Sequence, residues 1–132
     1  MIPLKPGMTG EAELIVGPEH TAASVGSGKV GVLATPVMIN LIEAAALQAV
    51  EDHRPDGQQS LGTFLEVSHI AATPVGMRVT AIAELVKVEG RHLELKVCAS
   101  DEVEEIGLGM HHRIVVNVAK FDARVARKSE MD

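Results

Sequence analysis

Residues 34–50, ATPVMINLIEAAALQAV, are apolar almost all the way round when they are placed on a helix. Thr35 followed by Pro36 is a typical helix start, because threonine suits the cap and proline is tolerated where the first amides have no helical partner. The following HRPDGQQ holds a proline and a glycine, which end the pattern. We therefore expect one helix from about Pro36 to Asp52. A helix with so little polar surface has to be covered on most sides by other parts of the chain.

The rest of the chain supplies strands to cover this helix. Alternation of apolar and polar residues with a period of two is typical of half-buried strands. One such segment precedes the helix and four follow it, which predicts an α+β fold in which a curled antiparallel sheet of about five strands wraps one long central helix. Residues 1–132 are expected to form a single domain. The expected strands are residues 9–16, 58–69, 77–88, 91–100 and 106–121.

Two segments lack any such pattern. Residues 17–31, GPEHTAASVGSGKVG, are rich in glycine and are expected to form a mobile loop. The charged tail after Phe121 has a similarly loose composition. Neither segment therefore contributes a helix or strand to the predicted fold.

Composition excludes several classes of function. The net charge of −6, without basic clusters, argues against a nucleic-acid groove, which needs positive charge to replace counterions. We find neither an apolar signal core nor a run of the ~18 to 20 apolar residues that span a membrane, and we expect a cytoplasmic protein without membrane contact. Cys98 is the only cysteine, so an internal disulfide is excluded, and it is expected to be a small buried strand residue. We expect no metal, because no pattern such as HExxH occurs, and we also expect no bound cofactor.

One acid, Glu43, stands inside the apolar helix. At ~100° per residue, Asn40, Glu43, Gln48 and Glu51 fall within a band of roughly 140°. An ordinary solvent-facing or interface stripe explains this band. If Glu43 is instead shielded from water, its proton affinity rises and it suits the role of a base or nucleophile near neutral pH.

His69 is the second candidate, because it ends the strand face that is expected to look at the helix. An inward histidine is usually a hydrogen-bonded core residue, but titratable groups that converge in one cleft are the usual mark of a site. Thr35 is explained by its cap role, and it lies about 12 Å from Glu43 along a helix axis at ~1.5 Å per residue. The two cannot hydrogen-bond within one regular helix. The other residues expected on the face of His69 are Leu61, Thr63, Leu65 and Val67.

Arg113 is a weaker candidate on the last expected strand. It shares a face with Gly107, Gly109 and His111, a narrow strip of small residues that could admit a ligand. A surface salt bridge explains Arg113 equally well. His111 and His112 are adjacent, so they point to opposite faces of a strand and cannot share a metal directly.

Several strings of the sequence resemble one known family. TPVMINLIEAAALQAV, SLGTFLEVSHIAATPVGMRVTAIAEL, VEGRHLELKVCASDEVEEIGLGMHHR and VAKF are similar to the fluoroacetyl-CoA thioesterase group of the hotdog superfamily, from about residue 35 to residue 128. The resemblance implies a hotdog fold that works as a dimer with active sites at the subunit interface, and open sheet edges independently favour a homodimer. The residues that match the family's site are Thr35, Glu43 and His69 as the catalytic set, with Gly62 and Arg113 beside the substrate.

The implied reaction is hydrolysis of an acyl-CoA thioester, with coenzyme A as part of the substrate. Such a reaction needs a nucleophile or activated water, a donor for the developing oxyanion, and protonation of the leaving thiolate. Glu43 would attack directly or activate water. The amide of Gly62, with the Thr35 hydroxyl, would stabilise the oxyanion, while His69 would orient groups or shuttle protons.

The segment before the threonine departs from the family pattern. Residues 25–34, VGSGKVGVLA, contain no aromatic residue, whereas the fluoroacetyl-specific enzyme carries phenylalanines in this lid. We therefore expect a small or short-chain acyl-CoA as the substrate. Two alternatives stay open: a hotdog acyl-CoA hydratase or dehydratase, although its usual Asp–His pair is not found at the helix start, and a non-catalytic acyl-CoA binding protein.

Overall fold

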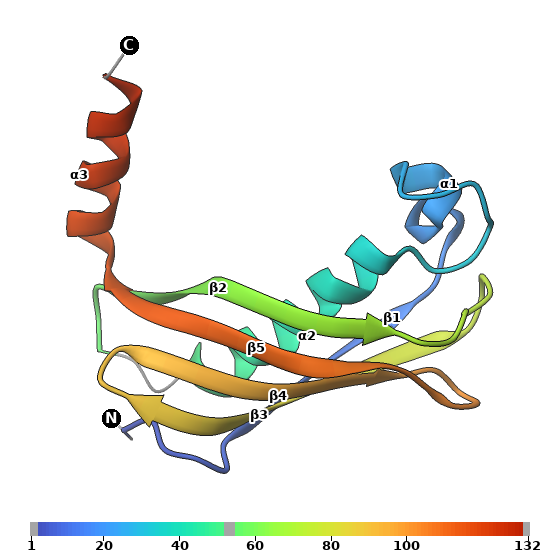
Figure 1. The fold of residues 1–132 in the computed structure, drawn as a ribbon, viewed down its shortest axis with the longest axis horizontal. Helices are drawn as coiled ribbons and strands as arrows, with labels where there is room; N and C mark the ends of the chain where they lie inside the picture. The colour runs from blue at the N-terminus through green and yellow to red at the C-terminus, as the bar shows by residue number, and fades with distance from the viewer. Residues whose placement is uncertain (1–2, 52–54, 131–132) are drawn as a thin grey trace.

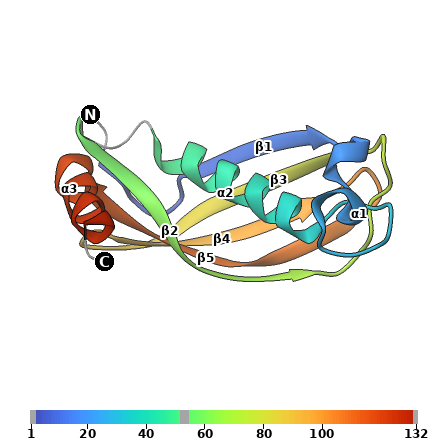
Figure 2. The same ribbon diagram turned by 90° about the horizontal axis from the view of Figure 1, so that it is seen from above.

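The computed structural model describes residues 3–51 and 55–130 of the chain. Five antiparallel strands form one sheet in the order β1-β3-β4-β5-β2, and the sheet curls round the long helix α2, Thr35–Glu51 (Figures 1 and 2). The predicted α+β architecture, with one central helix in a five-stranded antiparallel sheet, is confirmed. The strands are β1 Thr9–Ile15, β2 Gln58–His69, β3 Arg78–Glu89, β4 His92–Ser100 and β5 Glu105–Asn117.

Helix α2 supplies one wall of the hydrophobic core. It packs mainly against β1 and β3 and only lightly against β2. Its small residues let β1 approach closely: a Cβ on Gly10 would overlap the carbonyl oxygen of Ala45 and the amide of Ala49. The expected end of the helix at Asp52 lies outside the described residues. The α2 residues that are buried are Met38, Leu41, Ile42, Ala45, Ala46, Ala49 and Val50.

The start of α2 differs from the prediction. The carbonyl of Ala34 accepts the first helical hydrogen bonds, from the amides of Val37 and Met38, both at 3.1 Å. Ala34 therefore holds the cap position, and Thr35 is already the first helical residue. The predicted cap role of Thr35 is wrong, and its hydroxyl points to β2 instead.

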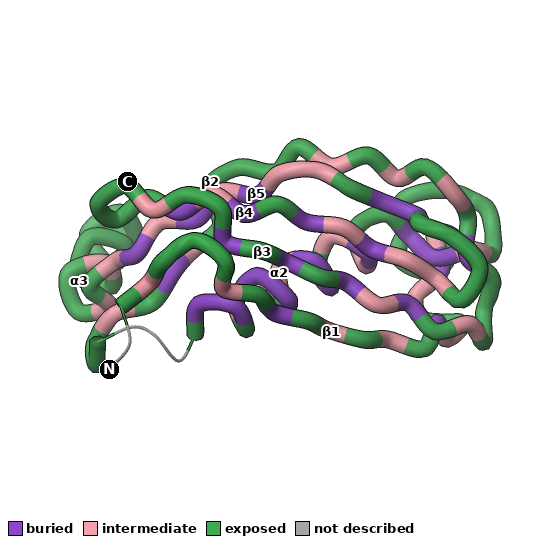
Figure 3. Tube along the Cα trace, turned by 90° about the horizontal axis from the view of Figure 1, so that it is seen from below, coloured by how far each residue is buried: buried purple, intermediate pink, exposed green. Residues whose placement is uncertain are grey.

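The sheet has one buried and one outer face, and successive residues of β3, β4 and β5 point alternately to the two faces (Figure 3). The predicted inward residues of β4 are confirmed, since Leu93, Leu95, Val97 and Ala99 are all buried. Cys98 lies between them on the outer face and is only half-buried, so its prediction as a buried residue is wrong. Its cross-strand neighbours there are Ile82 and Leu108, both exposed.

Strand β2 contains a β-bulge that reverses its alternation. The register with β5 shifts between Gly62 and Phe64, which leaves Thr63 as an extra residue. Gly62 pairs with the buried Arg113, so it lies on the inner face, and the predicted placing of Leu61 on the face of His69 is wrong. Thr63, predicted on the same face, is the extra residue of the bulge. The inner face of β2 consists of Ser60 and Gly62 before the bulge and Leu65, Val67 and His69 after it.

The C-terminal segment is a helix, not the end of a strand. Strand β5 ends at Asn117, and α3 runs over Val118–Ser129, so the strand predicted to reach Phe121 is too long. The Asn117 side chain caps α3 by accepting a hydrogen bond from the amide of Lys120 at 3.0 Å. Helix α3 buries none of its residues and extends beyond the β2 edge of the sheet (Figure 1). Neither α3 nor any other helix within the described residues has the length and apolar character to cross a bilayer.

Candidate active site

Two groups of polar side chains lie on the inner side of the sheet. The first joins the start of α2 to the end of β2, where Thr35 Oγ1 and His69 Nδ1 are hydrogen-bonded at 2.7 Å. Burial lowers the pKa of His69 below its ordinary value, and the backbone of Ala71 opposes this only in part. The imidazole is therefore neutral near pH 7. Its second nitrogen, Nε2, is buried and has no hydrogen-bond partner among the described residues, which is unusual for a core histidine.

A pocket of about 410 Å³ opens beside this pair. Its walls come from the segment between β1 and α2 and from the residues just after β2, so the Thr35–His69 pair stands where the two meet. The wall is mostly small and apolar. The lining residues are Ala22, Ser27, Gly28, Val30, Val32, Leu33, Thr35, His69, Ile70, Ala71 and Ala72.

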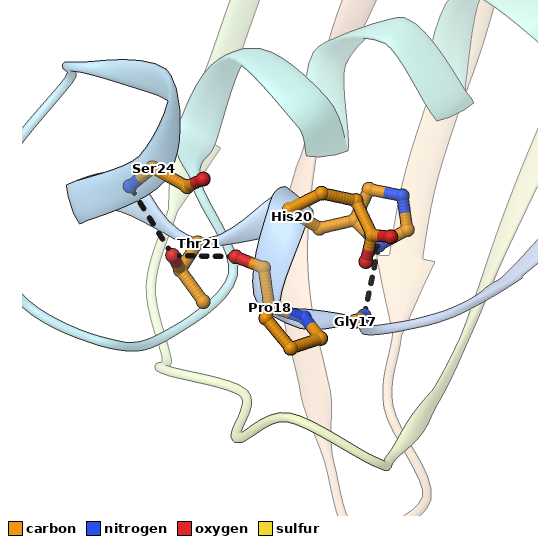
Figure 4. Close-up of polar contacts among 6 residues, drawn as sticks. Gly17, Pro18, His20, Thr21 and Ser24 are labelled. Carbon is orange, nitrogen blue, oxygen red and sulfur yellow. Dashed lines mark hydrogen bonds and ion pairs between the residues drawn. The ribbon is translucent and has the colours of Figure 1, made fainter.

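The segment that forms the outer wall is more structured than the predicted loop. It contains a short 3-10 helix, η1, Pro18–His20, and one turn of α-helix, α1, Ala22–Val25. Figure 4 shows the contacts that hold them: the Gly17 amide donates to His20 Nδ1 at 2.9 Å, and the hydroxyl of Thr21 both donates to the Pro18 carbonyl and accepts from the Ser24 amide. The mobility expected for residues 17–31 stays a prediction.

The second group surrounds Glu43 in the middle of α2. Glu43 is half-buried, and its carboxylate lies against the backbone of Gly62, where a Cβ would be 2.9 Å from Oε2. The same Cβ would be 3.0 Å from Cε1 of His111, so glycine is needed here for space. Glu43 was expected to meet His69, but within one chain its neighbouring imidazole belongs to His111.

His111 is completely buried, and its partners fix its protonation. The Phe64 carbonyl, 3.0 Å from Nδ1, can only accept, so Nδ1 carries the hydrogen. Arg113 Nη1, 3.1 Å from Nε2, can only donate, so Nε2 accepts. Burial first, and then the charge of Arg113, lower the pKa of His111, while the Phe64 hydrogen bond and the charge of Glu43 act in the opposite direction. The imidazole of His111 is therefore neutral, and its orientation is fixed by hydrogen bonds at both nitrogens.

Arg113 holds this group together. Its guanidinium donates to the Ser60 hydroxyl at 2.8 Å and to the Ser60 carbonyl at 2.9 Å, as well as to His111. Only 6% of Arg113 is exposed, so the reading as a surface salt bridge is wrong, while its place beside a ligand stays a prediction. Ser60 and His111 were not predicted as site residues. The shared strand face of His111 and Arg113 was the available signal, whereas Ser60 reaches the inner face only because of the bulge.

The two groups do not meet within one chain. His69 pairs with Gly107 and Leu65 pairs with His111, four residues apart on both strands. This separation corresponds to about 13 Å at ~3.3 Å per residue. One chain therefore brings Thr35 to His69 and Glu43 to Gly62, but it leaves Glu43 and His69 apart.

The chain matches one known protein family. A family model described as fluoroacetyl-CoA-specific thioesterase matches residues 16–119. A fluoroacetyl-CoA thioesterase from Streptantibioticus cattleyicolor is 47% identical over 98 residues, which are 74% of this chain and 70% of that protein.

Two solved structures extend the comparison. A mutant of the fluoroacetyl-CoA-specific thioesterase in complex with fluoroacetate and CoA is 38% identical, with a TM-score of 0.84, and covers 89% of this chain and 99% of its own. A hot-dog-like protein from Thermanaerovibrio acidaminovorans shares the fold at 22% identity, with a TM-score of 0.86 and coverage of 95% and 93%. Fold and relatives define the class, which is the hotdog-fold thioesterases. Within this class, the chain belongs to the fluoroacetyl-CoA-specific thioesterase family.

Within residues 3–51 and 55–130, no three His, Cys, Asp or Glu side chains are grouped as metal ligands.

Proposed function

We propose that this protein is an acyl-CoA thioesterase that hydrolyses a small or short-chain acyl-CoA to the acid and free coenzyme A. The observation that carries the proposal is the Thr35–His69 hydrogen bond beside the 410 Å³ pocket, in a chain of this family. The relative of known structure binds fluoroacetate and CoA. The described wall of the pocket holds no phenylalanine, tyrosine or tryptophan, which favours a short acyl group without selection for fluorine. The expected cytoplasmic location stays a prediction.

The complete site is proposed to form between two copies of the chain. Strand β2 is an edge strand with Phe64 and Leu65 about half exposed, and an unpaired edge of this kind can pair with a second copy. If two β2 strands pair antiparallel about Glu66, then Leu65 lies opposite Val67 of the partner subunit. Both residues belong to the inner face, as a continuous sheet requires.

The β-bulge then brings the two polar groups together. Because Thr63 is an extra residue, Gly62 lies opposite His69 of the partner subunit, and both are on the inner face. Directly opposite residues in such a pair have Cβ positions about 5 Å apart. Glu43, which lies against Gly62, thus faces the Thr35–His69 pair of the partner subunit, and the 13 Å gap within one chain is closed.

The proposed chemistry follows from the states of these groups. When the Thr35 hydroxyl donates to Nδ1 of the neutral His69, Nε2 carries the ring hydrogen and can donate to the thioester oxygen or to the leaving thiolate. The Glu43 carboxylate attacks the acyl carbon or removes a proton from the water that does so. If Glu43 attacks, the acyl group passes to its carboxylate as an anhydride while the C–S bond breaks, and water then cleaves this anhydride to release the acid and restore Glu43. If water attacks, its oxygen forms the new C–O bond while the C–S bond breaks. In both routes the leaving thiolate of CoA takes up the proton that the water loses. The backbone amide of Gly62 is proposed to support the oxyanion, while Arg113 positions the Glu43 surroundings through His111.

Thiol release is the direct test of the activity. The purified protein is incubated with acetyl-, propionyl-, butyryl- and fluoroacetyl-CoA, and free thiol is followed. We expect thiol release that falls on the order of 10²-fold or more in Glu43→Gln. Glu51→Gln, an exposed acid on the same helix, is the matched control and should remain active. Hydration of an enoyl-CoA without thiol release would assign a hydratase instead, and binding without any product would assign a binding protein.

Mixed dimers test whether the site is shared between subunits. Glu43→Gln and His69→Ala chains, each inactive alone, are unfolded together, refolded as a mixture and assayed. If Glu43 and His69 of different subunits form one site, half of the randomly mixed dimers hold one intact site, and activity returns to about a quarter of the wild-type value. If Glu43 and His69 of the same chain formed each site, both sites of a mixed dimer would contain one substituted residue, and no activity would return.

A further inference from the structure

Helix α3 has an apolar stripe that its own chain covers only in part. Val118, Phe121 and Val125 recur at the spacing of one helix face. Yet α3 buries none of its residues: Val118 and Phe121 are half-buried, Val125 is 48% exposed, and α3 packs mainly against β5, where it begins. An apolar stripe on an otherwise charged helix gains stability only when something packs on it.

The direction of α3 identifies what it meets. Its first amide donates to the Gly57 carbonyl at 2.9 Å, just before the start of β2. From there the helix continues past β2, and the view from above looks along its axis (Figures 1 and 2). Twelve residues extend about 18 Å at ~1.5 Å per residue, the width of three to four strands spaced ~4.8 Å apart. Beyond the β2 edge lies the second copy in the dimer proposed above, so α3 crosses the partner subunit.

The face beside the stripe is strongly basic. Lys120, Arg124, Arg127 and Lys128 stand against a single acid, Asp122, in a chain whose net charge is −6. By contrast, none of the described residues that line the pocket of Thr35 and His69 is a lysine or an arginine. The phosphate groups of coenzyme A are best held by such cations.

The proposed pairing brings α3 to the outer end of the partner's pocket. Gly62 lies opposite His69 of the partner subunit, and the start of β2 is four residues further along, about 13 Å at ~3.3 Å per residue. The N-terminal end of α3 therefore lies beside the segment that follows β2 in the partner subunit. That segment forms one wall of the partner's pocket. This distance is comparable to the length of the extended pantetheine arm, which separates the thioester of coenzyme A from its phosphates.

We propose that α3 is an exchanged arm, whose apolar stripe packs on the partner subunit and whose cations bind the phosphate groups of coenzyme A in the partner's pocket. The proposal rests on the proposed function, which supplies the dimer and the ligand. It assigns Arg124, Arg127 and Lys128 to substrate binding and leaves the thioester chemistry to the groups described above.

Binding of coenzyme A and of pantetheine separates this role from a structural one. Both affinities are measured by calorimetry for Arg124→Gln/Arg127→Gln/Lys128→Gln and for a control with the same change in charge, Lys5→Gln/Lys87→Gln/Arg91→Gln, whose residues are exposed elsewhere. We expect the α3 variant to bind coenzyme A on the order of tenfold more weakly, with pantetheine binding unchanged. The KM for acyl-CoA should rise with little change in kcat.

The outcomes distinguish this proposal from the proposed function. Unchanged affinity for coenzyme A in the α3 variant, or an equal loss in the control variant, overturns the role of α3 whether or not thioesters are hydrolysed. Absence of hydrolysis with the expected loss of affinity overturns only the proposed function.

Mixed dimers show which subunit's arm acts. In a mixture of His69→Ala and Glu43→Gln chains, the intact site takes Glu43 from the His69→Ala chain, and the arm beside that site belongs to the same chain. The triple α3 substitution should therefore raise KM when the His69→Ala chain carries it and have no effect on the Glu43→Gln chain. The opposite pattern would show that α3 serves its own subunit's pocket, and the exchange would be refuted.

Discussion

Placing a methyl group on Gly62 tests whether the Glu43 carboxylate has to stay where it is for thioester hydrolysis. The backbone of Gly62 is not in the left-handed region, so alanine meets no conformational barrier there. Its Cβ would lie 2.9 Å from Glu43 Oε2 and 3.0 Å from His111 Cε1, whereas ordinary contacts begin at 3.4 Å. Because both distances are shorter than an ordinary contact, the new methyl group needs about half an ångström of movement in its surroundings.

The hydrogen bonds decide which side chain moves. His111 is held from both ends of its ring, by the Phe64 carbonyl and by Arg113, whereas Glu43 is a flexible, half-buried side chain. Rotating the carboxylate away from its preferred rotamer costs about 0.5–1.5 kcal/mol. Replacing glycine restores about 0.4–1 kcal/mol by restricting the unfolded chain. We therefore expect the free energy of unfolding of Gly62→Ala to stay within about 1 kcal/mol of the wild-type value.

Activity should respond much more strongly than stability. A displacement of this size at a reacting group lowers kcat by about tenfold, since 1 Å can cost ~100-fold. Thiol release from acyl-CoA gives kcat, and urea unfolding gives the free energy. Wild-type kcat at unchanged stability would show that the position of Glu43 does not matter. A loss of stability above about 3 kcal/mol would show instead that the backbone, and not the carboxylate, gives way.

Three further predictions concern the same molecule. Glu43→Gln should change the free energy of unfolding by less than about 1 kcal/mol while thiol release is lost, and a large fall in stability would mark Glu43 as structural. Burial lowers the pKa of His69 and of His111, so the unfolded chain binds protons more readily than the folded chain does. The contribution of these two neutral histidines to the free energy of unfolding should be fully present above the unfolded pKa of about 6.5. It should be lost as the pH falls through their folded pKa values. Urea unfolding between pH 7.5 and 5 checks this, and His69→Asn should flatten the dependence, whereas an equal slope in the variant would contradict it. Gly10→Ala should cost about 3 kcal/mol or more in the same assay, because its Cβ overlaps the backbone of Ala45, which cannot rotate away, and a neutral result would mean that β1 is able to move off α2.

Much of the fold was predictable because local patterns set it. The apolar run of α2 and the alternation along β3 and β4 are properties of neighbouring residues, and the inward set of β4 was identified correctly from them. The helix α3 was missed because Val118 and Phe121 continue the apolar pattern of β5. Only the cap from Asn117 marks the change to a helix, and one asparagine is a weak signal.

The site was predictable only in part. Glu43 and His69 were found because a carboxylate on an apolar helix and an imidazole on an apolar strand face are anomalies that the sequence displays. The bulge at Thr63 could not be read from the sequence, because an extra residue shows itself only against the strand it pairs with. It is this bulge that places Gly62 against Glu43.

The sequence by itself determined which segments are buried and which residue types are available for chemistry, since burial periodicity and titratable groups are written into each segment. The tertiary structure alone decided which of these groups meet. Thr35 meets His69 and does not cap its own helix, and Glu43 meets Gly62 and not His69, which lies on the same strand as Gly62. Such meetings depend on strand register, and register is set by the pairing of residues that lie far apart in the chain.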